Sequence, residues 1–164
     1  MNMIEKTLVL LKPDAVQRGL IGEIITRFEK MGLKIVGMKM FLANEKFASE
    51  HYSDVKERRG EKVFMNNVKF LSEGPVVAIC IEGVHAIEIV RKLVGATEPK
   101  AALPGTIRGD YAHVSYSYAD EKNTVVRNLI HASSSKEDAE KEIKLWFKKD
   151  ELYSYKTVHE KHTL

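Results

Sequence analysis

Apolar positions along the chain change their period several times, and these changes predict four strands. Residues 6–11 and 75–82 are nearly continuous apolar runs, a pattern typical of strands that are buried on both faces. Lys12-Pro13 ends the first run, because proline disfavours regular structure at the residue before it. Residues 33–41 alternate, which predicts a strand with one wetter face, and residues 125–131 predict a fourth strand.

Between these strands the apolar positions follow the helical period. Residues 20–31 carry apolar side chains at helical spacing and are followed by Gly32, a typical helix stop. Three further helices are predicted over 44–52, 61–71 and 85–94. The last helix of the chain begins after three serines, where Ser134 and Glu137 have capping-box spacing. Its apolar face carries Ala139, Ile143, Trp146 and Phe147.

In chain order the elements read β-α-β-(αα)-β-α-β-α. Four strands with crossover helices predict an α+β fold, a ferredoxin-like βαββαβ sandwich in which helices cover a four-stranded antiparallel sheet. We expect a single domain over residues 1–164, with a core at about 5–155. Residues 96–110 predict a long loop, 111–122 an irregular excursion, and 156–164 a polar tail.

Composition and charge narrow the classes of partner. The chain has 164 residues, is 44% hydrophobic and 30% charged, and has a net charge of +3 with both signs interspersed. Its densest basic cluster, Lys56, Arg58, Arg59 and Lys62, is too mild for a nucleic-acid footprint but suits an anionic small molecule. Nucleic acid is therefore not expected as a primary partner.

Neither export nor a membrane is expected from the sequence. The N-terminus lacks a signal-peptide hydrophobic region, and no apolar run approaches the roughly 20 residues that span a bilayer. The single cysteine, Cys80, lies within an apolar run, which favours a buried structural thiol. A cytoplasmic location is expected.

Standard phosphate and metal motifs are missing from the sequence. It contains no GxxxxGK[ST] segment and no GxGxxG after a strand, so side chains must hold any phosphate. It also contains no HExxH, paired CxxC or EF-hand pattern, so a metal site made by protein side chains is not predicted.

One histidine stands out as a candidate nucleophile. His131 ends a predicted strand and is followed by small residues at a helix N-terminus, a natural place for anions. By position alone, a buried structural histidine is an equal alternative. Glu142 lies on the inward stripe of the following helix, and a buried carboxylate needs a partner. If the two side chains meet, the carboxylate holds one ring nitrogen and leaves the other free as a nucleophile. For His51 a structural role is favoured.

Several side chains could bind phosphate. Each of them alone is more often a surface charge or a turn residue. Together they could clamp the negative charge of a phosphoryl group during transfer. These candidates are Lys12, Arg91, Thr97 and Arg108.

From about residue 6 to 155, the chain resembles the nucleoside diphosphate kinase family. Seven separated motifs carry the resemblance, and chance agreement in this order is negligible. The motifs are KPDAVQRG at 12–19, RFEK at 27–30, HY at 51–52, GPVV at 74–77, GATEP at 95–99, PGTIRGD at 104–110 and NLIHAS at 128–133.

The resemblance implies a ping-pong kinase. The γ-phosphate of a nucleoside triphosphate would pass to His131 and then to a nucleoside diphosphate, with Mg²⁺ bridging the nucleotide phosphates. Broad base and sugar specificity and a homo-hexamer or homo-tetramer are further implications, the loop at 99–104 contributing to subunit contacts. By similarity, Lys12 and Asn128 would contact the sugar and nearby phosphate oxygens, Arg91, Thr97 and Arg108 the phosphates, Tyr52 would position or shield the histidine, and Ser133 and Glu142 would support it.

The sequence departs from the family pattern in three places. Counting without gaps puts Val63 where the family's base-stacking phenylalanine sits, and a shift of one residue would give that role to Phe64. Ser134 replaces the usual aspartate after the active-site serine. About ten extra residues separate Arg108 from Asn128, and this extra length is expected to alter the rim of the nucleotide cleft.

Three other functions remain as alternatives. Ferredoxin-like sandwiches also serve as binding modules, although an RNP-type aromatic strand pattern is missing here. A scaffolding member of the family without activity should have lost His131, Lys12 or Arg108, all of which are present. A histidine-dependent phosphatase would need a water placed to attack the phosphohistidine.

Overall fold

The computed structural model describes residues 3–164 and contains one four-stranded sheet. The elements, in order, are β1 (Ile4–Leu11), α1 (Pro13–Gln17), α2 (Ile21–Lys30), β2 (Lys34–Phe41), α3 (Glu45–His51), α4 (Val55–Arg59), α5 (Glu61–Leu71), β3 (Val76–Val84), α6 (Ala86–Val94), η1 (Pro99–Ala101), α7 (Ile107–Tyr111), α8 (Tyr116–Glu121), β4 (Ile130–Ala132), α9 (Lys136–Trp146), η2 (Lys149–Glu151) and α10 (Glu160–Thr163).

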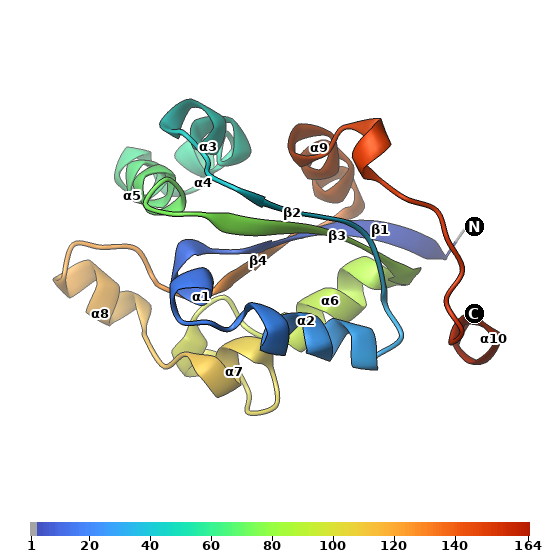
Figure 1. Ribbon diagram of the computed structural model, residues 1–164. Helices are drawn as coiled ribbons and strands as arrows, with labels where there is room; N and C mark the ends of the chain where they lie inside the picture. Colours follow the sequence, from blue (N-terminus) through green and yellow to red (C-terminus); the bar gives the residue numbers. More distant parts are fainter. Residues whose placement is uncertain (1–2) are drawn as a thin grey trace.

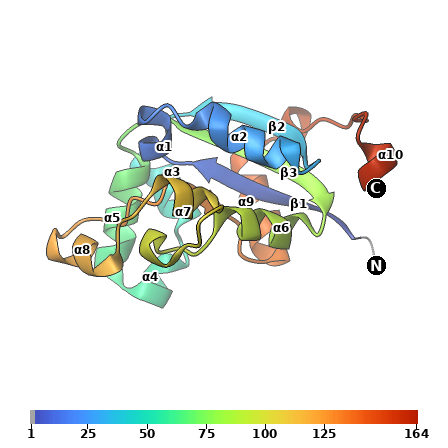
Figure 2. The same cartoon turned by 90° about the horizontal axis from the view of Figure 1, so that it is seen from below.

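The sheet has the strand order β2-β3-β1-β4, and each neighbouring pair is antiparallel. Helices α3, α5 and α9 cover one face, and α2, α6 and α7 cover the other (Figures 1 and 2). The buried strands β1 and β3 lie in the centre, as their apolar runs require. The ferredoxin-like α+β prediction is therefore confirmed.

Two apolar cores lie on opposite faces of the sheet, because successive side chains of a strand point to opposite faces. On β1, Leu8 and Leu10 belong to the core beneath α3, α5 and α9, whereas Val9 and Leu11 belong to the core beneath α2 and α6. Trp146 of α9 anchors the first core and makes edge-on contacts with two phenylalanine rings, at 5.7 and 4.8 Å between centroids.

The fourth strand is shorter than the sequence predicts. Residues 125–131 were expected to be extended, but β4 contains only Ile130–Ala132 and pairs with Val9, Leu10 and Leu11 of β1. The preceding Leu129 has a φ of 70°, and the N–H of Ile130 donates to the carbonyl of Asn128 at 2.8 Å. This tight turn interrupts the ladder, because a left-handed residue cannot continue a strand.

Two other local predictions are corrected. The N-cap of α9 is Ser135, whose hydroxyl accepts from the N–H of Asp138, and not Ser134, whose hydroxyl donates to the Asp138 carboxylate. Glu137 therefore takes no part in the predicted capping box with Ser134. The excursion predicted as irregular at 111–122 contains helix α8, which Ser115 caps by accepting from the N–H of Tyr118.

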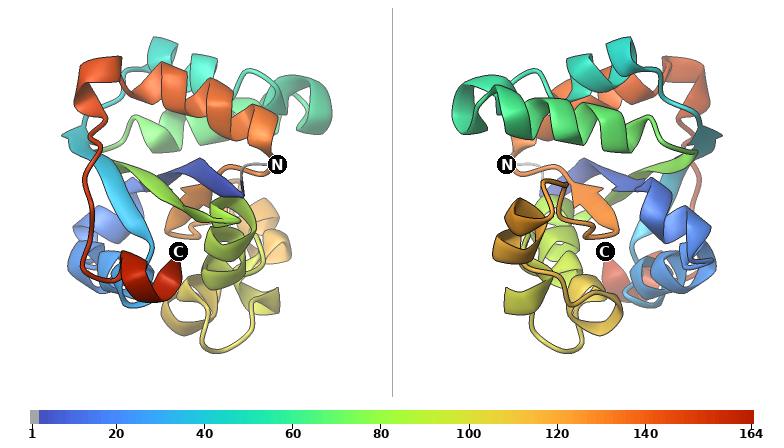
Figure 3. Two further views of the ribbon diagram at one scale, coloured as in Figure 1. Left: turned by 90° about the vertical axis from the view of Figure 1, so that its right-hand side faces the viewer. Right: turned by 90° about the vertical axis from the view of Figure 1, so that its left-hand side faces the viewer.

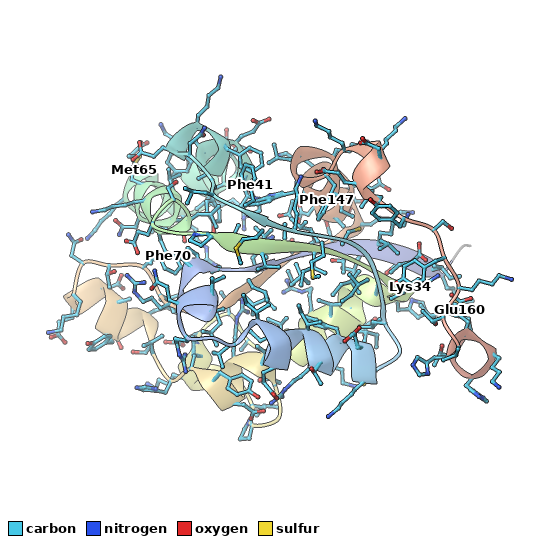
Figure 4. All side chains as sticks on the ribbon, viewed as in Figure 1. Lys34, Phe41, Met65, Phe70, Phe147 and Glu160 are labelled. Carbon is cyan, nitrogen blue, oxygen red and sulfur yellow. The ribbon has the colours of Figure 1, made fainter. Side chains whose placement is uncertain are left out.

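The C-terminal segment runs beside the edge strand β2 (Figure 3). The N–H of Tyr153 donates to the carbonyl of Val36 at 2.7 Å, which satisfies part of the free edge. Farther along, Lys34 and Glu160 form an ion pair at 2.8 Å (Figure 4). Within residues 3–164, no helix has both the length and the apolar character needed to cross a bilayer.

Candidate active site

His131 lies in β4, opposite Leu10 of β1, and its ring meets a carboxylate of α9. Nε2 of His131 lies 2.8 Å from Oε1 of Glu142, and the hydroxyl of Ser133 donates to Oε2 of Glu142 at 2.6 Å. The N–H of Leu8 donates to the same hydroxyl, which ties this chain of contacts to β1. The structure thus brings together the three residues that the sequence analysis joined only by inference.

The charge state of Glu142 follows from these contacts. Burial alone would raise the pKa of Glu142, but His131, His51 and the Ser133 hydroxyl together lower it below its usual value. At neutral pH it is therefore a carboxylate that accepts the Nε2–H of His131. This leaves Nδ1 as the ring nitrogen with a lone pair, and no residue in 3–164 makes a hydrogen bond to it.

His51 is a part of this site that sequence reasoning assigned to structure alone. It is 6% exposed, and its ring lies edge-on to the ring of His131 with 4.9 Å between centroids. The indole N–H of Trp146 donates to Nδ1 of His51 at 3.2 Å. Burial, aided by the nearby His131, lowers the pKa of His51 to about 3, so this ring is neutral. In the sequence, the only sign of the contact between His51 and Trp146 is the place of Trp146 on the apolar face of the last helix.

Lys12 and Arg108 are both buried beside the turn before β4. Nζ of Lys12 donates to Oδ1 of Asn128 at 2.7 Å. The Arg108 guanidinium donates to the carbonyls of Asn128, Gly95 and Ile130, at 3.2, 3.1 and 2.6 Å. These bonds hold the tight turn in place and fix the position of the Arg108 side chain, which lines a cavity.

Burial also changes the acidity of both cations. It lowers the pKa of Lys12 to about 8, with a further lowering from the nearby Arg108 and an opposing effect of Asp14. The pKa of Arg108 falls to about 10, chiefly through burial and then through Arg91, whereas Tyr116 raises it. Neither cation forms an ion pair with a carboxylate of residues 3–164, and two desolvated cations in one cavity favour a bound anion.

These side chains line a cavity of about 590 Å³. Arg91 and Thr97, both exposed, also line it. Tyr52 lines it too, and its buried hydroxyl has no hydrogen-bond partner in the described residues. Ser133 lies behind Glu142 and does not reach the cavity. The predicted residues on its wall are Lys12, Tyr52, Arg91, Thr97, Arg108, Asn128, His131 and Glu142.

Of the two candidates for the stacking position, only one lines the cavity. Val63 lines the cavity, whereas Phe64 does not and packs on the core beneath α3, α5 and α9. Successive residues of a helix differ by about 100° in direction, and Lys62, Val63, Asn66 and Asn67 form the face of α5 that lines the cavity. Val63 therefore occupies this wall of the cavity, and Phe64 belongs to the core.

The sequence analysis did not predict one further wall of the cavity. It comes from the segment that follows α7, including Tyr116, Ala119 and Asp120 of α8 and the residues up to Val126. The i, i+3, i+4 spacing of Tyr116, Ala119 and Asp120 is the one sign in the sequence of a helix in this segment.

One group of side chains could in principle share a metal ion. Ligand atoms of His51, His131 and Glu142 lie within 4.8 Å of one another. Two imidazoles and a carboxylate suit zinc or copper, whereas Mg²⁺ prefers oxygen ligands. Glu142 is moreover engaged with His131 and Ser133, so this cluster does not fit Mg²⁺.

The lowered pKa of Lys12 makes activity depend on pH. Below about pH 8 the ammonium is charged and can bind phosphate, and above it the charge is lost. We expect kcat/KM, which reports the free enzyme, to fall as pH rises through about 8. Lys12→Arg should shift this limb to higher pH, because arginine stays charged. The exposed Lys122→Arg serves as control, and an unchanged limb in Lys12→Arg would contradict the assignment.

Comparison with known proteins agrees with this geometry. A family model described as nucleoside diphosphate kinase matches residues 5–152. The nucleoside diphosphate kinase of Borreliella burgdorferi is 49% identical over 156 residues, which cover 94% of this chain and 93% of that protein. The enzyme of Pyrococcus furiosus is 52% identical over 155 residues, covering 94% and 90%.

Solved structures give the same result. A transition-state mimic of the Borrelia burgdorferi nucleoside-diphosphate kinase with bound vanadate and ADP has a TM-score of 0.97 and 47% identity, covering 99% of this chain and 98% of that one. A halophilic nucleoside diphosphate kinase from Halobacterium salinarum in complex with CDP has a TM-score of 0.82 and 43% identity, covering 94% and 95%. This chain belongs to the nucleoside diphosphate kinase family.

Proposed function

We propose that this chain transfers the γ-phosphate of a nucleoside triphosphate to a nucleoside diphosphate through a phosphohistidine at His131. The observation that carries the proposal is the contact of 2.8 Å between Nε2 of His131 and Glu142, in a cavity with two buried cations. This contact holds the ring in one tautomer and leaves Nδ1 as the nucleophile.

In the first half-reaction, the Nδ1 lone pair forms a bond to the γ-phosphorus. The bond from that phosphorus to the oxygen shared with the β-phosphate breaks, and its electrons leave with the nucleoside diphosphate. The ring then carries positive charge, which Glu142 stabilises while it keeps the Nε2–H. In the second half-reaction, a terminal oxygen of another diphosphate attacks the phosphohistidine, and the electrons of the N–P bond return to Nδ1.

The residues around the cavity suit the charge that this transfer spreads over the phosphoryl oxygens. Lys12 and Arg108 supply positive charge from buried positions, Arg91 supplies it from the exposed rim, and Thr97 offers a hydroxyl donor there. Donors already fixed before the reaction need no reorganisation as negative charge develops. Asn128, which binds Lys12, would contact the sugar together with it.

Mg²⁺ fits the proposal as a companion of the nucleotide. At the phosphate end of the cavity, in the described part of the chain, the Glu142 carboxylate is held by His131 and Ser133, and the Asp138 carboxylate accepts from the Ser134 hydroxyl. The remaining donors there are cations and a hydroxyl, which bind phosphate and not Mg²⁺. The ion would then be held by the nucleotide phosphates, where it neutralises charge.

Val63 on the cavity wall makes a separable prediction for the nucleobase. We expect Val63→Ala to raise the KM for nucleoside diphosphates about threefold, because apolar contact with the base is lost. Phe64→Leu should instead lower the free energy of unfolding by about 1 kcal/mol with little change in KM, since Phe64 packs on the core. Steady-state kinetics and chemical denaturation of both variants check this. A change in KM for the Phe64 variant alone would assign the contact with the base to Phe64.

The exposed apolar residues support a homo-oligomer, which we propose to be a hexamer or tetramer. Met38 and Met40 on the edge strand β2 are 55% and 60% exposed, and Leu103 in the 99–104 loop is 73% exposed. Large apolar side chains on a sheet edge favour pairing with another chain. Native mass spectrometry gives the number of subunits, and a monomer at micromolar concentration would refute the proposal.

A cytoplasmic location is likewise proposed, and cell fractionation tests it.

Free diphosphates and triphosphates of nucleosides are the substrates in the proposal, and the CDP complex of the halobacterial relative supports this substrate class.

The kinase proposal is tested by following the phosphate. The protein is incubated with γ-labelled ATP and Mg²⁺, and then chased with GDP. We expect an acid-labile, base-stable label on the protein that leaves as labelled GTP. Release as inorganic phosphate without an acceptor would favour the phosphatase, and nucleotide binding without any label would favour the binding module.

A further inference from the structure

Helix α8 presents one face to the nucleotide cavity. Three residues of the helix line it, Tyr116, Ala119 and Asp120, and residues 123–126, which follow the helix, line it as well. The three helical residues are at positions i, i+3 and i+4, which is the spacing of a single helical face. The intervening Ser117, Tyr118, Glu121 and Lys122 lie away from the cavity.

The segment is held in this orientation at both ends. At its start, the Glu98 carboxylate accepts from the N–H of Tyr116 at 2.8 Å, and Ser115 caps the helix. At its end, the N–H of Thr124 donates to the carbonyl of Ala119 at 2.9 Å. Ala119 itself is 3% exposed, so the helix is packed against its surroundings.

The direction of α8 assigns its residues to different parts of a nucleotide. Tyr116 lies near enough to Arg108 to influence that side chain, and Arg108 belongs to the phosphate end of the cavity. Asp120 is one helical turn farther on, about 6 Å along the axis. Helices α5 and α8 lie at the same end of the molecule (Figures 1 and 2), with Val63 and Asn67 of α5 and Asp120 of α8 on the wall of one cavity.

Asp120 is free to bind a ligand. Its carboxylate makes no hydrogen bond or ion pair with any residue in 3–164, whereas Asp54, another acid on the cavity wall, is paired with Arg58 at 2.5 Å. A carboxylate only accepts hydrogen bonds. It therefore distinguishes bases by the donors on their edges.

We propose that Asp120 reads the nucleobase and favours guanine. Guanine offers two adjacent donors, N1–H and the 2-amino group, which match the two oxygens of a carboxylate. Adenine and cytosine place a ring acceptor beside their amino group, and uracil flanks its N–H with two carbonyls, so each of them would repel one carboxylate oxygen. The preference for guanine is superimposed on the broad acceptance of bases that an apolar contact with Val63 permits.

This inference rests on the proposed kinase function, and the same phosphoenzyme tests it. Labelled phosphoenzyme is discharged with GDP, IDP, ADP and UDP, and kcat/KM is obtained for each. For the wild type we expect GDP to exceed ADP and UDP about tenfold. IDP, which lacks only the 2-amino group, should lie between them. Asp120→Asn, which replaces one acceptor by a donor, should reduce the ratio of GDP to ADP about tenfold and abolish the difference between GDP and IDP.

Glu121→Gln is the matched control, since Glu121 neighbours Asp120 on the outward face and its carboxylate forms an ion pair only with Lys122 among residues 3–164. It should keep the wild-type ratios. Thermal unfolding of both variants shows whether α8 is intact. Equal rates for GDP and IDP in the wild type, or an equal loss for all four acceptors in Asp120→Asn, would overturn the inference. If no phosphoenzyme forms from ATP at all, it is the kinase proposal that fails.

Discussion

His131→Asn is expected to form no labelled phosphoenzyme and to lose at least about 10⁴-fold in the rate of phosphate transfer between nucleotides. Asparagine keeps a polar side chain of similar reach but lacks a nucleophilic ring nitrogen. Because His131 lies at the edge of the cavity and is only half-buried, the fold should survive the change. Labelling with γ-labelled ATP and a coupled assay of triphosphate formation measure both effects.

The matched control is His113→Asn, since His113 is exposed and does not line the cavity. This variant should behave as the wild type. Binding of ADP to His131→Asn, measured by calorimetry, should remain, because the phosphate-binding cations are untouched. A variant that still transfers phosphate through a stable phosphoenzyme would show that another residue is the nucleophile.

Arg108→Ala and Arg91→Ala are expected to separate stability from phosphate binding. Arg108 is 7% exposed and donates to three carbonyl groups around the turn before β4, whereas Arg91 is exposed. Removing Arg108 takes this donor from the buried carbonyl of Ile130 and the part-buried carbonyl of Gly95, which should lower the free energy of unfolding by about 3 kcal/mol. The melting temperature would then fall by roughly 6–12 °C. Arg91→Ala should leave it nearly unchanged.

Activity should fall in both variants, because each removes a positive charge from the phosphate end of the cavity. We expect kcat to drop by about 10²-fold for either change, the loss typical of removing one donor that stabilises transition-state charge. Calorimetry of unfolding and steady-state kinetics on the same preparations separate the two effects. Equal melting temperatures for the two variants would contradict the structural role assigned to Arg108, and wild-type activity in Arg91→Ala would exclude it from phosphate binding.

The local pattern of apolar and polar residues was sufficient to predict most of the fold. The apolar runs of β1 and β3, the alternation in β2 and the helical spacing in α2, α6 and α9 each depend on side chains within a few residues of one another. The left-handed turn at Leu129 escaped this reasoning, because its geometry is held by distant groups. Asp14 accepts the N–H of Leu129, and Arg108 donates to the carbonyls on either side of that residue.

The candidate site likewise combines features that the sequence predicts with features that depend on distant contacts. Motifs in the sequence named the residue types that phosphate transfer needs, and the structure brings most of them to one cavity. Phe64 and Val63 could not be separated by pattern, since the direction of a side chain on α5 depends on how the helix rotates against its neighbours. Asp120 was hidden for a similar reason, because α8 is short and its orientation is fixed by Glu98, which lies 18 residues before Tyr116.

By itself, the sequence determined the strand and helix types, the α+β class and the candidate chemistry of His131, because these follow from short-range periodicity and residue type. Only the tertiary structure decided the contact between His131 and Glu142, the neutral His51 beside them and the wall that α8 adds to the cavity. Such contacts join segments that are distant in the chain, and their geometry is set by the packing of helices against the sheet rather than by any local preference.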